Sequence, residues 1–90
     1  MDPFHLQVGI RSDMLTLEAE GAVLTYPMSG IDKAGLLRAM EAVANRGSIS
    51  LGVISVVPDL VTIGKMGIDL NAHDYRRQTY LILKEIAGWL

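Results

Sequence analysis

The chain has 90 residues, half of them hydrophobic, with a mean hydropathy of +0.31, no cysteine and a net charge of −2. This length predicts one domain over residues 1–90, and the lack of cysteine excludes disulfide and thiolate chemistry and favours the reducing cytoplasm. Because neither half carries a polybasic surface, we expect no binding to nucleic acid.

Three strands are expected ahead of the first helix. Residues 4–10 and 14–20 both alternate apolar and polar side chains, which is typical of half-buried strands. The short turn between them predicts an antiparallel hairpin. Residues 22–26 form a third expected strand, which Pro27 ends.

A helix is expected from Ser29 onward. Ser29 is a suitable cap and is followed three residues later by Asp32, which favours the helix N-terminus. Gly47 is expected to end the helix in a left-handed conformation. The expected buried stripe consists of Ile31, Ala34, Leu37, Met40, Val43 and Ala44.

The segment 48–57 is expected to be a strand whose apolar side chains change face near Val53. Two explanations remain open for this change. Either the strand is central and covered on both faces, or a bulge near Val53 shifts its register.

A turn at residues 58–59 leads into a further expected strand, 60–63. Gly64 and Gly67 then bracket a corner, and residues 68–70 are expected to form a brief extended piece. Because a Gly-rich corner ahead of a helix is the general setting of an anion site, phosphate binding there is one hypothesis and a simple turn is the other.

The last helix is expected to begin with Asn71 as its cap and to run towards Leu90. Its expected buried stripe consists of Tyr75, Thr79, Ile82, Leu83, Ile86 and Leu90. The order β-β-(β)-α-β-β-α predicts an α+β fold, with an antiparallel sheet of four to five strands and both helices on one of its faces.

Membrane insertion and export are not expected. The least charged stretch, 47–64, is interrupted by glycine, proline and serine, whereas a membrane span needs about 20 mainly apolar residues. The N-terminus shows no basic segment followed by an apolar run, so we expect no signal peptide.

No catalytic or metal-binding pattern emerges from the sequence. His73 could combine with Asp59, Asp69 and Asp74, but this set lacks the paired spacing of a zinc site. None of the serines lies in a nucleophile elbow. We therefore expect a protein that is not an enzyme and that has no metal and no cofactor.

The last helix carries the residue types that dominate protein interfaces. The candidate partner-binding residues are Tyr75, Arg76, Arg77, Tyr80, Leu81 and Trp89. An equally open interpretation is that Tyr80 and Leu81 pack against the margin of the sheet.

A second candidate surface is the strand around residues 51–57. If this strand lies at an edge, its apolar residues Leu51, Val53 and Val57 would need to be paired, and a symmetric dimer would pair them. The high apolar content also favours a surface that a partner covers.

The sequence therefore predicts a small, non-enzymatic regulatory, adaptor or inhibitor protein that binds another protein and is itself a homodimer. A subunit of a larger assembly would have the same features. The alternative is a small-molecule or anion-binding sensor, or a minimal enzyme, that uses the Gly64–Gly67 corner and His73.

Overall fold

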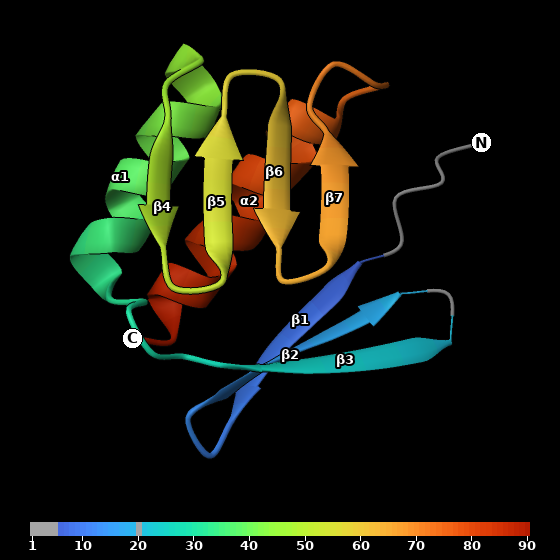
Figure 1. The fold of residues 1–90 in the computed structure, drawn as a ribbon, viewed down its shortest axis with the longest axis vertical. Coiled ribbons are helices and arrows are strands. Elements are labelled where there is room, and N and C mark those ends of the chain that lie inside the picture. The colour runs from blue at the N-terminus through green and yellow to red at the C-terminus, as the bar shows by residue number, and fades with distance from the viewer. Residues whose placement is uncertain (1–5, 20) are drawn as a thin grey trace.

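Our computed structural model describes residues 6–19 and 21–90, in which two α-helices and seven β-strands follow the order β1-β2-β3-α1-β4-β5-β6-β7-α2 (Figure 1). The predicted α+β class is confirmed, and the order of elements agrees roughly with the prediction. The strands form two antiparallel sheets, of three and four strands, where a single sheet was expected. Phe4 and Glu20, the ends of two expected strands, lie outside the described residues.

The three-stranded sheet is formed by β1 (Gln7–Arg11), β2 (Met14–Ala19) and β3 (Ala22–Pro27) in that spatial order. The predicted hairpin between β1 and β2 is confirmed, with Arg11 opposite Met14. Its two-residue turn, Ser12 and Asp13, has positive φ angles of 50° and 62°, the backbone of a tight hairpin turn.

Helix α1 (Lys33–Asn45) begins one turn later than predicted. Asp32, not Ser29, is the cap, and its Oδ1 accepts a 2.6 Å hydrogen bond from the amide of Gly35. At the other end Arg46, not Gly47, adopts the left-handed conformation, with φ 57°.

The buried side of α1 is rotated from the predicted stripe. Met40 and Val43 are buried as expected, whereas Ala34, Leu37 and Ala44 are exposed. Within the helix the buried positions start at Gly35 instead of Ala34, which rotates the buried side relative to the predicted stripe. The buried residues of the helix are Gly35, Leu36, Ala39, Met40, Ala42 and Val43.

The four-stranded sheet is a meander of β4 (Ile49–Leu51), β5 (Ile54–Val57), β6 (Leu60–Ile63) and β7 (Met66–Asp69). Both explanations for the change of face near Val53 are therefore wrong. Residues 48–57 form a hairpin, in which Leu51 pairs with Ile54 around a turn at Gly52 and Val53. The change of face is the turn itself, because the chain reverses between two short strands.

A second tight turn, at Gly64 and Lys65, joins β6 to β7, and Gly67 lies within β7. The turn places Gly64 at φ 61°, a left-handed conformation that glycine adopts without strain. The expected corner is therefore one compact hairpin, with its two turn residues at the end of the sheet.

Helix α2 (Tyr75–Gly88) begins after Asp74, so Asn71 is not its cap. Thr79, Ile82, Leu83 and Ile86 are buried as predicted. Leu90 is exposed, because the helix ends before it.

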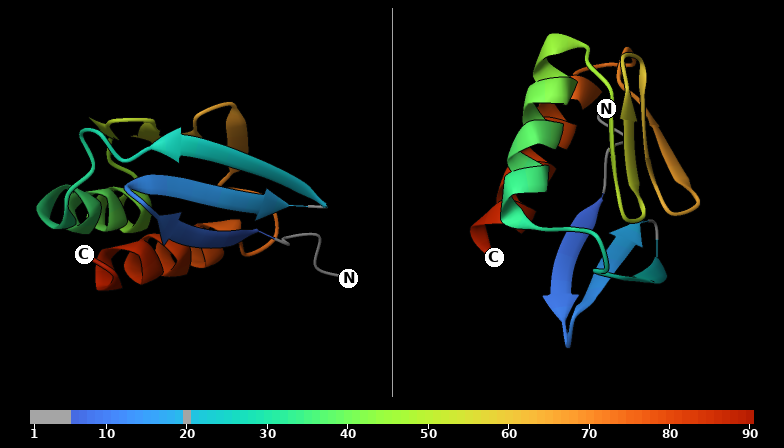
Figure 2. Two further views of the ribbon diagram at one scale, coloured as in Figure 1. Left: turned by 90° about the horizontal axis from the view of Figure 1, so that it is seen from below. Right: turned by 60° about the vertical axis from the view of Figure 1, so that its left-hand side comes forward.

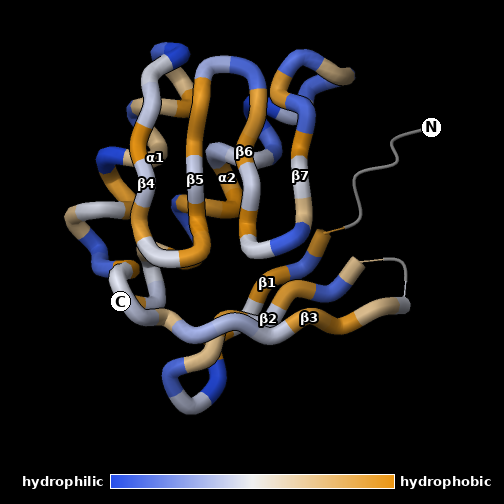
Figure 3. Tube along the Cα trace, viewed as in Figure 1, coloured by the Kyte–Doolittle hydropathy of each residue, from blue (hydrophilic) through white to orange (hydrophobic). Residues whose placement is uncertain are grey.

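Both helices pack on one face of the four-stranded sheet, and the three-stranded sheet crosses the lower end of this two-layer unit (Figures 1 and 2). From this position β2 directs Leu15 and Leu17 into the core, where both are fully buried. Figure 3 shows how apolar and polar residues alternate along the strands. The core is thus closed on three sides: by the helices, by the four-stranded sheet and by the three-stranded sheet.

Candidate functional site

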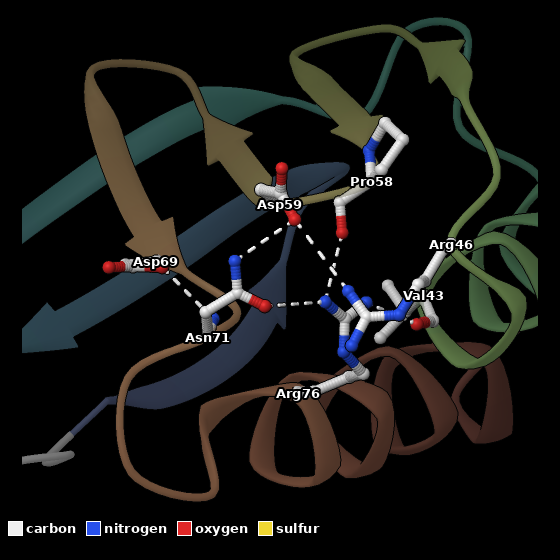
Figure 4. Close-up of polar contacts among 7 residues, drawn as sticks. All are labelled: Val43, Arg46, Pro58, Asp59, Asp69, Asn71 and Arg76. Atoms are coloured by element: carbon white, nitrogen blue, oxygen red, sulfur yellow. Dashed lines mark hydrogen bonds and ion pairs between the residues drawn. The ribbon is translucent and has the colours of Figure 1, made fainter.

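Arg76, a predicted partner-binding residue, is bound within the protein itself. Its Nη1 donates to the carbonyl oxygen of Val43 at 2.8 Å, and its Nη2 donates to the carbonyl oxygen of Pro58 at 2.9 Å (Figure 4). Nη2 also donates to Oδ1 of Asn71 at 3.2 Å. Arg76 therefore connects the start of α2 to the end of α1 and to the β5–β6 turn.

Asn71 extends this network towards the sheet. Its Nδ2 donates to Oδ1 of Asp59 at 2.9 Å, and its backbone amide donates to Oδ1 of Asp69 at 2.9 Å (Figure 4). The same oxygen of Asp59 lies 3.6 Å from Nη1 of Arg46, although both of these side chains are largely exposed. These polar residues therefore stabilise the β5–β6 turn and the segment that follows β7.

Tyr75 and Tyr80 are half-buried and pack against the hydrophobic core. The ring of Tyr75 also lies 5.3 Å from the ring of His73, measured between centroids. Tyr80 therefore contributes to the core, whereas Leu81 is 43% exposed.

Four exposed residues, spaced four apart, form a row along the outer side of α2, and we call this row the α2 stripe. It consists of Arg77, Leu81, Glu85 and Trp89. Side chains four apart are neighbours on a helix, but a turn takes about 3.6 residues, so each is rotated by about 40° from the one before. The row therefore winds around α2 from Arg77 to Trp89, which lies one residue past the end of the helix. Trp89 is 46% exposed, and Arg77 approaches Asp74 in the preceding turn, with Nη1 3.4 Å from Oδ2. The stripe thus combines two large apolar side chains with two charges.

The end of α2 adjoins a second apolar feature. Leu90 is 49% exposed and lines a shallow depression of about 370 Å³ beside the β1–β2 turn. Its other apolar lining residues are Ile10, Met28 and Ile31. Apolar surface therefore continues from Leu90 towards the three-stranded sheet.

The backbone amides of the Gly64–Lys65 turn already have partners within the protein. The amide of Gly64 donates to the carbonyl oxygen of Val53 at 2.9 Å, and that of Lys65 donates to Oη of Tyr26 at 3.1 Å. His73 follows the other end of β7, so the structure does not bring it together with this turn (Figure 1). No observation here favours the predicted anion or small-molecule site.

The predicted dimer-edge residues do not share one edge. The strand order is β4-β5-β6-β7, so Leu51 lies on an edge strand and Val57 on an inner one. Leu51 is buried on the helix side, where one of its methyl groups lies close to Gly35. Val53 is half-buried in the turn between β4 and β5.

One surface was missed by the sequence analysis: the side of the four-stranded sheet turned away from the helices. The described chain leaves this side uncovered (Figures 1 and 2). Small residues cross it in register, and two apolar residues, Val57 (42% exposed) and Leu60 (39% exposed), lie opposite each other beside them. We call it the open sheet face; it consists of Ser50, Ser55, Val57, Leu60, Thr62, Gly67 and Asp69, which lies opposite Leu60. Apolar and polar residues alternate along each strand. This alternation becomes visible only when residues 48–57 and 60–70 are each divided into the two strands of a hairpin.

The possible metal ligands named from the sequence do not form a site. Within the described residues, no group of three or more histidine, aspartate or glutamate side chains could hold a metal ion. Asp59 and Asp69 instead accept hydrogen bonds from Asn71.

None of the described helices combines the length and apolar character needed to cross a bilayer. Comparison with protein-family models, with curated proteins and with solved structures finds no match to this chain.

Proposed function

We propose that this protein is a small, non-enzymatic regulatory, adaptor or inhibitor protein that binds another protein through the α2 stripe. The observation that carries the proposal is the exposure of two large apolar side chains: Leu81, on the side of α2 opposite the buried Leu83 and Ile86, and Trp89, one residue past the end of the helix. Because Leu83 and Ile86 already fill the core, the stripe is free to bind a partner.

The chemistry of the stripe supports this function. Trp and Arg are enriched among the residues that dominate binding energy at interfaces. Covering a leucine side chain fully contributes roughly 1.5–3 kcal/mol, so Leu81 and Trp89 together offer a substantial part of a binding free energy. The flanking charges of Arg77 and Glu85 would set the orientation of the partner.

We further propose that the protein is a homodimer and that it is located in the cytoplasm. The dimer is supported by the high apolar content. The location is supported by the absence of cysteine from a small domain, since such domains in oxidising compartments often depend on disulfides.

A photo-crosslinking residue at position 81, introduced in the source cells, tests the binding function. We expect a discrete covalent adduct with another protein, because Leu81 would lie inside the interface. The matched control carries the photo-crosslinking residue at position 38 instead. This position is exposed on α1 and lies on the side of Gly35, towards β4 and away from α2. Absence of an adduct at position 81, or equal adducts at both positions, would contradict the proposal.

A further inference from the structure

We propose that two copies of this chain exchange their three-stranded sheets, so that β1–β3 of each copy closes the core of the other. This inference deepens the proposed function, because it rests on the homodimer and names the contact that forms it. The exchange uses surfaces that are already buried within one chain. The α2 stripe of both copies therefore stays available, and the dimer presents the partner-binding surface twice.

The surface that a second copy would cover is the one that the chain's own sheet covers. Leu15 and Leu17 of β2 are fully buried in the core, and the ring of Tyr26 on β3 lies directly against Gly64. The amide of Lys65 also donates to Oη of Tyr26 at 3.1 Å. Because an identical sheet from another copy makes the same contacts, the exchange needs no new complementary surface.

The three-stranded sheet is separable from the rest of the chain. In the part of the chain that the structure describes, none of its strands pairs with a strand of the four-stranded sheet. Residues 28–32 connect β3 to α1 and so join the sheet to the two-layer unit (Figures 1 and 2). A change in these five residues therefore releases the sheet as a unit, with its own strand pairing intact.

The connecting segment contains a turn that can act as a hinge. The amide of Ile31 donates to the carbonyl oxygen of Met28 at 3.0 Å, and Gly30 has φ 80°, which together define a type II turn. The turn packs closely against the β4–β5 turn, because a Cβ added to Gly30 would lie 3.0 Å from the backbone nitrogen of Gly52. An extended segment of five residues spans about 17 Å, so opening this turn carries the sheet away from its own core.

Two variants of the hinge should shift the balance between monomer and dimer in opposite directions, because the core contacts are the same in both forms. Gly30→Ala strains the closed turn but not an extended hinge, so it should lower the dimer dissociation constant at least about tenfold. Ser29→Pro favours the closed turn, since proline is preferred at its second position, and should raise the dissociation constant about fivefold. Sedimentation equilibrium of samples refolded from urea over a concentration series measures both shifts.

Gly21→Ala is the matched control for backbone strain. Gly21 also has a positive φ angle, of 82°, but it precedes β3 within the exchanged sheet and lies outside the hinge. Its substitution should leave the dissociation constant unchanged. A wild-type protein that stays monomeric after refolding at every concentration, or hinge variants that dimerise like the wild type, would overturn the inference.

A crosslink across the contact between Tyr26 and Gly64 distinguishes an exchanged dimer from two closed chains that merely associate. 4-Azidophenylalanine in place of Tyr26 keeps the ring beside Gly64 and forms a covalent bond there on illumination. In the isolated dimer we expect links between two chains, seen as a covalent dimer on a denaturing gel, whereas the isolated monomer should give links within one chain. Links within one chain in both fractions would overturn this inference and leave the homodimer in place. Loss of the position-81 adduct alone would instead overturn only the binding function.

Discussion

Nη1 of Arg76 lies 2.8 Å from the carbonyl oxygen of Val43, which joins the first turn of α2 to the last turn of α1. The last four carbonyl groups of a helix have no partner within the helix. A cation at this position donates a hydrogen bond to one of these carbonyl groups and also interacts favourably with the negative end of the helix dipole. The two helices are thereby fastened together at one end, in addition to their apolar packing.

Arg76→Ala should lower the free energy of unfolding by about 2 kcal/mol, because three hydrogen bonds from a charged group are lost together. The control is Arg77→Ala, one residue away. The Arg77 side chain is 72% exposed and its ion pair with Asp74 is loose, so its removal should cost less than about 0.5 kcal/mol. Urea unfolding of the two variants measures the difference. Equal losses would show that Arg76 is no more structural than Arg77.

Gly64→Ala should destabilise the protein by about 2 kcal/mol or more, through left-handed backbone strain and overlap of the new methyl group with the Tyr26 ring. Gly21→Ala isolates the strain, because Gly21 has φ 82° with no atom near its added Cβ. That variant should lose only about 1 kcal/mol. In a Tyr26→Ala background the cost of Gly64→Ala should fall to the same level. If it stays unchanged in that background, the ring is not the obstacle.

Thr79 presents a different case, a fully buried hydroxyl on α2. Among the described residues, its Oγ1 is the buried side-chain oxygen without a hydrogen-bond partner. Thr79→Val keeps the shape and removes the polar atom, so thermal and urea unfolding should show a gain of about 1 kcal/mol. Thr79→Ser, which keeps the hydroxyl and loses the methyl group, should show a loss of about 1 kcal/mol. A loss in Thr79→Val would indicate that the hydroxyl is satisfied after all.

The start of α1 can be tested by removing each candidate cap. Asp32→Ala should cost about 1 kcal/mol, since it removes the acceptor of the Gly35 amide. Ser29→Ala, at the residue that the sequence favoured, should change the free energy of unfolding by less than about 0.5 kcal/mol. The opposite ranking, measured by urea unfolding, would return the cap to Ser29.

The strongest local signals in the sequence were sufficient for much of the fold. The β1–β2 hairpin and the buried side of α2 follow from long, regular patterns such as Thr79, Ile82, Leu83 and Ile86. The hairpin at Gly52 and Val53 was missed because strands of three and four residues are too short to show where one ends. Leu36 and Leu37 are adjacent, so the exact rotation of α1 depends on tertiary packing and not on the pattern alone.

The candidate site was predictable only in part. The position of Leu81 away from the apolar stripe of the last helix indicated its exposure. The role of Arg76 was not accessible from local sequence, because its acceptor on Val43 is 33 residues away. The open sheet face depends likewise on the alignment of four strands, in which Ser55 meets Thr62 and Thr62 meets Gly67.

The central claim, that this chain works by binding protein, is tested most directly by native mass spectrometry of untagged protein purified gently from its source cells. We expect a mass that corresponds to a homodimer or to a stoichiometric complex with another protein, and that returns to the monomer mass on denaturation. A monomer carrying a small-molecule adduct would contradict the account and favour a ligand-binding function.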